Sequence, residues 1–160
     1  MSTDFTHLDP DGNPRMVNVT QKADTLRTAT AQGFVAMQEK TLAAIEARKT
    51  KKGDVLGIAR LAGIMAAKQT GQLIPLCHPL MLSAVEVTIE PDGHDRLMIV
   101  ATCRLVGKTG VEMEALTAVS IAALTIYDMC KSIDRSIEIH SISLVEKHGG
   151  ASGSWQKVTG

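Results

Sequence analysis

The sequence has few aromatic residues and no excess charge. Phe, Tyr and Trp make up only 2% of its 160 residues, so base stacking on aromatic side chains is a poor basis for binding. Seventeen Lys and Arg residues balance 17 Asp and Glu residues, and the formal net charge is zero. A protein that binds nucleic acid through its phosphates needs a positive excess, so we expect no nucleic-acid partner.

The sequence also gives little support for disulfide bonds, a signal peptide or a membrane-spanning segment. The three cysteines, Cys77, Cys103 and Cys130, are odd in number and widely spaced, which does not suit a disulfide framework. Residues 1–15 lack the apolar core of a signal peptide. The longest stretch without Lys, Arg, Asp or Glu, residues 69–85, is short and broken by glycine and proline, so it does not suit a bilayer span. We therefore expect a cytoplasmic protein without membrane contact.

The length fits one domain. We expect a flexible N-terminal arm over residues 1–15, a single α+β domain over 16–150 and a flexible tail over 151–160. Apolar spacing and turn residues predict the elements within the domain. The predicted helices cover residues 23–30, 41–49, 54–70 and 115–127, and the predicted strands cover residues 16–19, 83–90, 97–105 and 137–145. This order favours helices packed on one face of an antiparallel sheet.

The helix predicted over residues 115–127 has no charged residue. A helix that is apolar all round is buried on most sides, and 13 residues are too few to cross a membrane. A small domain seldom surrounds a helix completely, so we expect this helix to contact another subunit as well.

Carboxylates stand at both ends of this helix. Thr109 and Glu112 have the spacing of a capping box, which leaves Glu114 unexplained; Glu112 and Glu114 do not share a helix face. At the far end, Asp128 and Lys131 form either a surface ion pair or, in a partly dry pocket, an acid–base pair. Glu114 and Asp128 lie about 21 Å apart along the helix, so one site that uses both must form where subunits meet.

Other candidate side chains lie in loops. Lys52 directly precedes a helix whose N-terminal N–H groups attract anions, and Lys147 adds a second cation, although charge runs are usually solvated. Cys77 and His78 lie between prolines, either in a structural turn or with His78 as a hydrogen-bonding or acid–base group. No paired Cys or His spacing supports a metal site. A phosphate loop at residues 107–109 is rejected, because it requires a glycine where Thr102 stands.

Four blocks of sequence resemble one family closely: KGDV at 52–55, LIPLCHPL at 73–80, GKTGVEMEALT at 107–117 and AALTIYDMCK at 122–131. They are similar to the cyclic pyranopterin monophosphate synthases, the C proteins of molybdenum cofactor (molybdopterin) biosynthesis. The resemblance covers about residues 14–153. It implies a ferredoxin-like subunit in a homohexamer built as a trimer of dimers, with sites at subunit interfaces. It also implies a lyase that rearranges a cyclised dihydro-GTP into cyclic pyranopterin monophosphate and releases pyrophosphate.

The resemblance also implies roles for individual residues. Asp128 and Lys131 match the catalytic acid–base pair, and Lys52 matches another essential lysine. Positions that match the family's substrate-binding residues are Leu76, Cys77, His78, Glu112, Met113 and Glu114, with Lys68 and Lys147 as weaker matches for phosphate or pocket contacts. The substrate is a small-molecule triphosphate; no cofactor is expected, and a divalent metal such as Mg²⁺ with the triphosphate stays an open question.

Two positions depart from the family pattern. Asn18 stands where Asp is frequent, and Ala151 stands where Lys is frequent, which removes one phosphate contact. Two other classes remain as alternatives: a non-catalytic oligomeric domain that binds a nucleotide, and a purely structural assembly protein. The first needs the lysines but not the Asp128–Lys131 pair, and the second binds no nucleotide.

Overall fold

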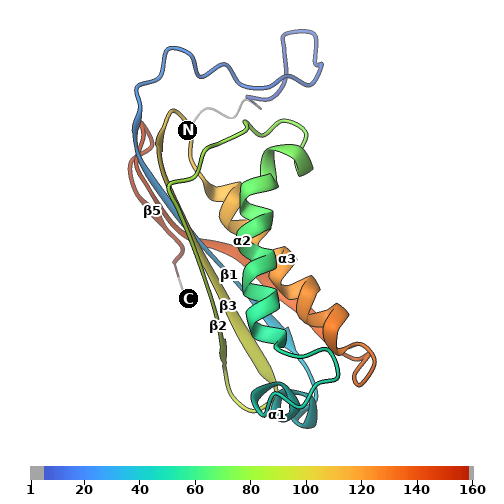
Figure 1. Ribbon diagram of the computed structural model, residues 1–160. Coiled ribbons are helices and arrows are strands. Elements are labelled where there is room, and N and C mark those ends of the chain that lie inside the picture. Colours follow the sequence, from blue (N-terminus) through green and yellow to red (C-terminus); the bar gives the residue numbers. More distant parts are fainter. Residues whose placement is uncertain (1–5, 159–160) are drawn as a thin grey trace.

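The computed structural model describes residues 6–158. Its elements are β1 (Thr25–Ala36), α1 (Glu39–Glu46), α2 (Val55–Leu73), β2 (Ala84–Pro91), β3 (Arg96–Gly107), α3 (Glu112–Cys130), β4 (Glu138–His148) and β5 (Trp155–Gln156). The strands form one antiparallel sheet in the order β2-β3-β1-β4-β5, and α2 and α3 lie side by side on one of its faces (Figure 1). Without α1 and β5, this is the βαββαβ ferredoxin-like arrangement. The expected α+β class is confirmed.

The central strand β1 corrects one prediction. Residues 23–30 are not a helix: β1 begins at Thr25 and pairs with β3 on one side and β4 on the other. Alternate residues such as Ala29 and Ala31 are completely buried. Tertiary pairing on both edges overrides the helix preference of alanine, and the threonines of this segment suit a strand.

The N-terminal segment also differs from the predicted elements. Residues 16–19 form no strand; the segment from 6 to 24 contains turns and one bridge between Leu8 and Pro14. Part of the predicted arm, residues 1–5, lies outside the described residues. In the tail, β5 pairs with Glu146 and Lys147 of β4. The strand predicted over 137–145 is present as β4, which shifts register twice against β1.

Small residues set the distance between the two long helices. A Cβ added to Gly63 of α2 would lie 2.9 Å from the carbonyl oxygen of Ala118 in α3, so a larger residue at position 63 would push the two helices apart. Asp54 caps α2, and its carboxylate accepts a hydrogen bond of 2.9 Å from the N–H of Gly57. Gly71 does not end the helix. It allows close contact with the backbone at Pro79, and α2 continues to Leu73.

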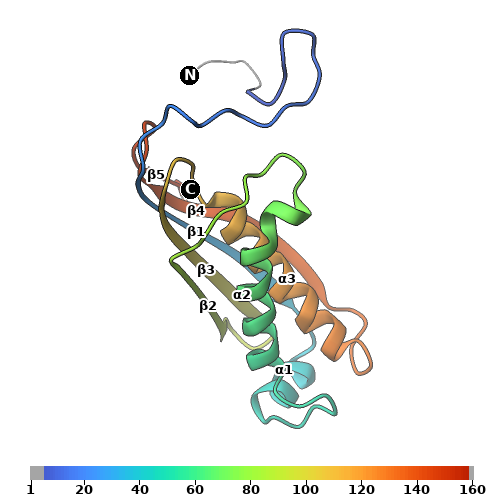
Figure 2. The ribbon, with the colours of Figure 1, turned by 45° about the horizontal axis from the view of Figure 1, so that its top comes forward.

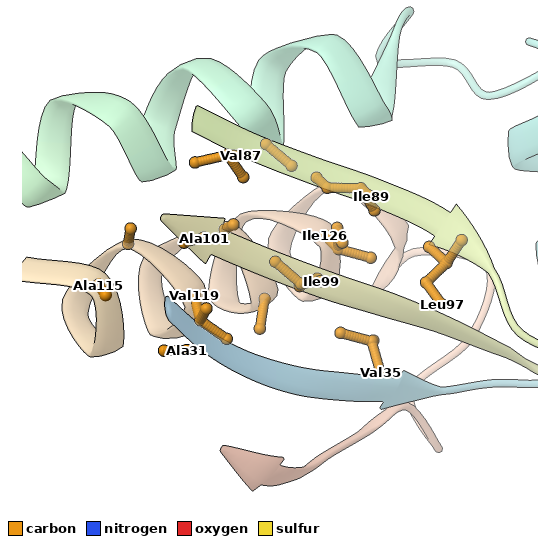
Figure 3. Packing of buried hydrophobic residues seen from close by; sticks show 14 of the residues in the cluster. Ala31, Val35, Val87, Ile89, Leu97, Ile99, Ala101, Ala115, Val119 and Ile126 are labelled. Atoms are coloured by element: carbon orange, nitrogen blue, oxygen red, sulfur yellow. The ribbon is translucent and has the colours of Figure 1, made fainter. Parts of the chain in front are cut away.

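The core lies between the sheet and α3 (Figure 3). Val35, Leu97 and Ile99 of the sheet meet Val119 and Ile126 of α3, and all five are completely buried. By length and composition α3 could cross a membrane, but its buried side packs against the strands and α2, as in the core helix of a globular domain. The opposite side of α3 is open in the single chain, where Leu124 is 54% exposed.

Candidate active site

A cavity of about 280 Å³ opens at the N-terminal end of α3. Three segments line it: the first turn of α3 with the loop before it, the loop that follows α2, and the N-terminal segment that crosses this end of the molecule (Figure 2). The cavity brings together six of the predicted substrate-binding residues: Leu76, Cys77, His78, Glu112, Met113 and Glu114.

Glu114 is the buried charge of this cavity. It is 3% exposed, and burial, assisted by the neighbouring carboxylate of Glu112, raises its pKa to about 7. Near neutral pH the carboxyl group therefore exchanges readily between its protonated and ionised forms. Such a group can donate or accept a proton or hydrogen bond in the cavity.

Glu112 and Lys147 form an ion pair at the rim. The Nζ atom of Lys147, on β4, lies 3.0 Å from Oε1 of Glu112 and 3.1 Å from Oγ of Ser152. The predicted capping box is wrong: α3 starts after Val111 without a side-chain cap, because the Glu112 carboxylate pairs with Lys147. Although Glu112 and Glu114 do not share a helix face, both line the cavity, with Glu112 paired to Lys147 and Glu114 buried.

The loop after α2 holds His78 and Cys77 in different environments. The Nε2 atom of His78 lies 2.8 Å from the carbonyl oxygen of Val17, which orients the ring and ties the N-terminal segment to the cavity wall. Burial raises the pKa of the Cys77 thiol, with a smaller contribution from Glu114. The neutral thiol is a weak nucleophile, so Cys77 suits a contact with a bound molecule better than covalent chemistry.

Lys68 lies beside this cavity. It lines a smaller hollow of about 180 Å³, between α2 and the segment 79–81, that reaches Glu114 from the other side. Lys68 therefore adds a cation to the hollow that Glu114 also lines. The structure therefore places eight of the eleven predicted residues around the N-terminal end of α3.

The remaining three residues meet at the C-terminal end of α3. Asp128 Oδ1 lies 2.6 Å from Lys131 Nζ, and Asp128 Oδ2 lies 3.3 Å from Lys52 Nζ. Lys52 also donates a hydrogen bond of 2.8 Å to the backbone carbonyl of Asp128. Hydrogen bonds from Lys131 and Lys52 lower the pKa of Asp128, and the bond to Asp128 raises the pKa of Lys131.

This cluster does not lie in a dry pocket of the single chain. The side chains of Asp128, Lys131 and Lys52 are 59%, 54% and 45% exposed, so the partly dry environment suggested by the sequence is wrong for one copy of residues 6–158. The uncharged turns of α3 cover the sheet, and in the last turn Ile126, Met129 and Cys130 stay buried while the Asp128 side chain faces solvent. The helix N-terminus beside Lys52 is already occupied by the carboxylate of Asp54.

Several cavity residues have no clear signal in the sequence. The cavity is also lined by His7, Val17, Val19 and Lys22. These residues belong to the segment 6–24, which contains no helix or strand. Lys108 donates a hydrogen bond of 2.8 Å to the carbonyl of Thr20 and holds this segment in place. Only the three-dimensional path of the segment shows these contacts.

Arg27 is another residue that the sequence pattern hides. It is a buried arginine on the inward phase of β1, and it donates hydrogen bonds of 3.3 Å to the carbonyls of Gly107 and Lys108. These bonds fix the loop that leads into α3. A charged residue at an inward-facing strand position is the signal that could have indicated this role, once the strand itself is known.

A mostly apolar cavity with a few polar groups and a titratable carboxyl group is typical of an enzyme that acts on a small molecule. Residues 16–150 match the model of the MoaC family, and the chain belongs to this family. It is 59% identical over 153 residues to a Mycobacterium tuberculosis protein named cyclic pyranopterin monophosphate synthase 3, covering 96% of this chain and 86% of the relative. The same identity and coverage of this chain relate it to cyclic pyranopterin monophosphate synthase 1 of Mycobacterium bovis, of which 90% is covered.

Proposed function

We propose that this enzyme is a cyclic pyranopterin monophosphate synthase of molybdenum cofactor biosynthesis. Its substrate is then (8S)-3′,8-cyclo-7,8-dihydroguanosine 5′-triphosphate, and its products are cyclic pyranopterin monophosphate and pyrophosphate, which makes it a phosphorus–oxygen lyase. Membership in the MoaC family and the names of relatives at 59% identity support this activity. The structural observation that carries it is the division of acid, base and cationic groups between the two ends of α3.

The two groups of residues need a second copy of the chain to act together. Within one copy they are separated by nearly the whole of α3, about 21 Å between Glu114 and Asp128. We propose that the site forms between subunits of a homohexamer, a trimer of dimers, with one end supplied by a neighbour. Exposed apolar side chains on the outer faces of the two long helices support contacts between copies: Ile58, Leu61, Met65 and Leu124.

In this site the N-terminal end of α3 binds the substrate. Glu114 and His78 offer hydrogen bonds to a polar ring system, and Leu76, Met113 and Cys77 provide contact area around it. Lys68 and Lys147 stand where cations can meet phosphate groups. Release of Lys147 from Glu112 is needed for full contact with a phosphate, because the two side chains are paired here.

The C-terminal end of α3 supplies proton transfer and charge stabilisation. The ion pair keeps Asp128 ionised and Lys131 charged, so Asp128 can accept a proton and Lys131 can donate one once the substrate separates the pair and removes these pKa shifts. Opening and reclosure of the ring system require such transfers. Formation of the cyclic phosphate places negative charge on the departing pyrophosphate, which Lys52 can stabilise.

The direct test is incubation of the protein with the cyclised dihydro-GTP, followed by mass analysis for the pyranopterin product. We expect product from the wild-type chain and none from Asp128→Ala or Lys131→Ala, with the assembly size unchanged in both variants. Unchanged product formation in these variants, or nucleotide binding without turnover in the wild type, would favour the non-catalytic nucleotide-binding domain. Absence of nucleotide binding in calorimetry would favour a structural assembly protein.

A further inference from the structure

A second carboxylate, Asp134, is buried near the exposed cluster but does not touch it. Asp134 is 2% exposed and lies between α3 and β4. Its side chain accepts five hydrogen bonds: from Gln38 N at 2.9 Å, Gln38 Nε2 at 3.2 Å, Thr41 Oγ1 at 3.0 Å, Ser136 N at 2.9 Å and Ser136 Oγ at 2.6 Å. Although burial raises its pKa, these bonds outweigh burial and lower it to about 2, so the group is ionised at neutral pH.

These bonds join two segments that are distant in sequence. Gln38 is the N-cap residue of α1 and has no side-chain cap of its own. The Asp134 carboxylate accepts the N–H of Gln38 itself and brings negative charge to the positive end of α1. Ser136 belongs to the segment that leaves α3 toward β4. Asp134 therefore ties the exit of α3 to the start of α1.

Each tied segment leads directly to the cluster. On the α3 side, the N–H of Asp134 bonds to the carbonyl of Cys130 at 3.0 Å, and the N–H of Lys131 bonds to the carbonyl of Tyr127 at 2.8 Å. On the other side, α1 leads into the loop 47–54 that carries Lys52, which reaches Asp128. Buried Leu42 and Ile45 fix α1 against the core, so the loop starts from a rigid helix.

The cluster itself cannot supply this rigidity. Its three side chains are about half exposed, and exposed ion pairs between long side chains hold their geometry weakly. Catalytic groups need support from residues locked by packing and hydrogen bonds. Of the contacts described around this end of α3, the Asp134 network is the one that is both buried and linked to the segments of Lys52 and Lys131.

We propose that Asp134 is a positioning residue, whose five buried hydrogen bonds fix the spacing between the loop of Lys52 and the last turn of α3. The geometric part of this inference stands on the structure of the chain alone. Its kinetic consequence rests on the proposed function. A misplacement of acid and base by about 1 Å can lower a rate by about 100-fold.

The geometric part is tested by carboxyl titration of Asp128, followed by NMR. The wild-type pKa is expected below the ordinary value because Lys131 on α3 and Lys52 on the preceding loop both face the carboxylate. In Asp134→Asn and Asp134→Ala we expect it to rise, more in the alanine variant, because Lys52 moves away. Removal of the Asp134 charge alone would lower the Asp128 pKa, so a rise reports lost positioning.

The kinetic part compares variants that are destabilised in different places. Val87→Ala, in β2, removes buried core volume far from the cluster and serves as the control. We expect Asp134→Ala to lower kcat by about tenfold or more with KM within about threefold, Asp134→Asn to retain part of kcat, and Val87→Ala to leave kcat and the Asp128 pKa unchanged at assay temperature.

The two parts can fail separately. An Asp128 pKa that stays low, or falls, in folded Asp134 variants overturns the proposal whatever the turnover. A rise in pKa together with no turnover in the wild-type chain supports positioning and contradicts the proposed function. If Asp134→Ala does not fold, Ser136→Ala and Thr41→Val each remove one hydroxyl bond, and a smaller rise is expected; no rise in either variant overturns the proposal.

Discussion

The two ends of α3 differ in how much of a site one chain can build. The N-terminal end has a cavity, a buried carboxyl group with a pKa of about 7 and an oriented histidine. The C-terminal end has an ion-pair cluster that is about half exposed. The N-terminal end has a cavity that can bind a ligand, but few of its charged groups are free to act on that ligand. The C-terminal end has the ion-paired acid and base groups but no cavity around them. In the homohexamer that we propose, a neighbouring copy would complete each end.

The largest expected effect comes from removing the cations of the exposed cluster. If this cluster performs proton transfer, Lys131→Ala lowers kcat by about 10²–10⁴-fold, even though its loss barely alters folding of the exposed helix end. The measurement is product formation by mass analysis, with melting temperature recorded in parallel. Lys157→Ala is the matched control, because it removes an exposed lysine that directly follows the edge strand β5. This variant should keep full activity. Equal turnover in both variants would remove the cluster from the mechanism.

The buried end should instead dominate the dependence of stability on pH. Because the folded-state pKa of Glu114 is raised from 4.5 to about 7, its contribution is fully present below pH 4.5 and is lost as the pH rises through 7, by up to about 3 kcal/mol. Glu114→Gln removes the ionisation. We expect the free energy of unfolding of this variant, measured by urea denaturation, to increase relative to that of the wild type as the pH rises from 4.5 to 8. A difference independent of pH contradicts the burial of an ionising group.

The smallest expected effect concerns the starts of the two long helices. Asp54→Ala removes a side-chain cap from α2 and should lower the free energy of unfolding by about 1 kcal/mol. Thr109→Ala removes no cap from α3, since that helix begins without one, and should change stability by less than about 0.5 kcal/mol. Thermal denaturation of both variants checks the difference, and a larger loss for Thr109→Ala would restore the capping box.

The sequence predicts those features that depend on neighbours along the chain. Alternation in Val85, Val87 and Ile89 indicates the β2–β3 hairpin, and the uncharged run before Asp128 indicates the core helix; both are present. The ion pair of Asp128 with Lys131 follows from their spacing of three residues. Helix geometry also places Glu114 and Asp128 at opposite ends before any coordinates are known.

Features that depend on distant partners are the ones the sequence hides. The first residues of β1 are predicted as a helix, but pairing with β3 and β4 makes them a strand. Glu112 is predicted as part of a capping box, but its carboxylate pairs with Lys147 of β4. The sequence hides the role of Asp134, because the Ser136 bonds are local but Gln38 and Thr41, at the start of α1, lie more than 90 residues away. Exposure of the Asp128 cluster was equally hidden, since a run of apolar residues says nothing about the side chains that follow it.

The central claim is that one working site combines the N-terminal end of α3 from one copy with the C-terminal end from another. Mixing tests it most directly: Glu114→Gln and Lys131→Ala chains, each of which we expect to be inactive alone, are co-expressed in equal amounts and assembled together. If sites form between copies, about a quarter of them receive two intact ends, and about a quarter of wild-type product formation returns. If the mixture is as inactive as its two components, each site lies within a single chain and the account is wrong.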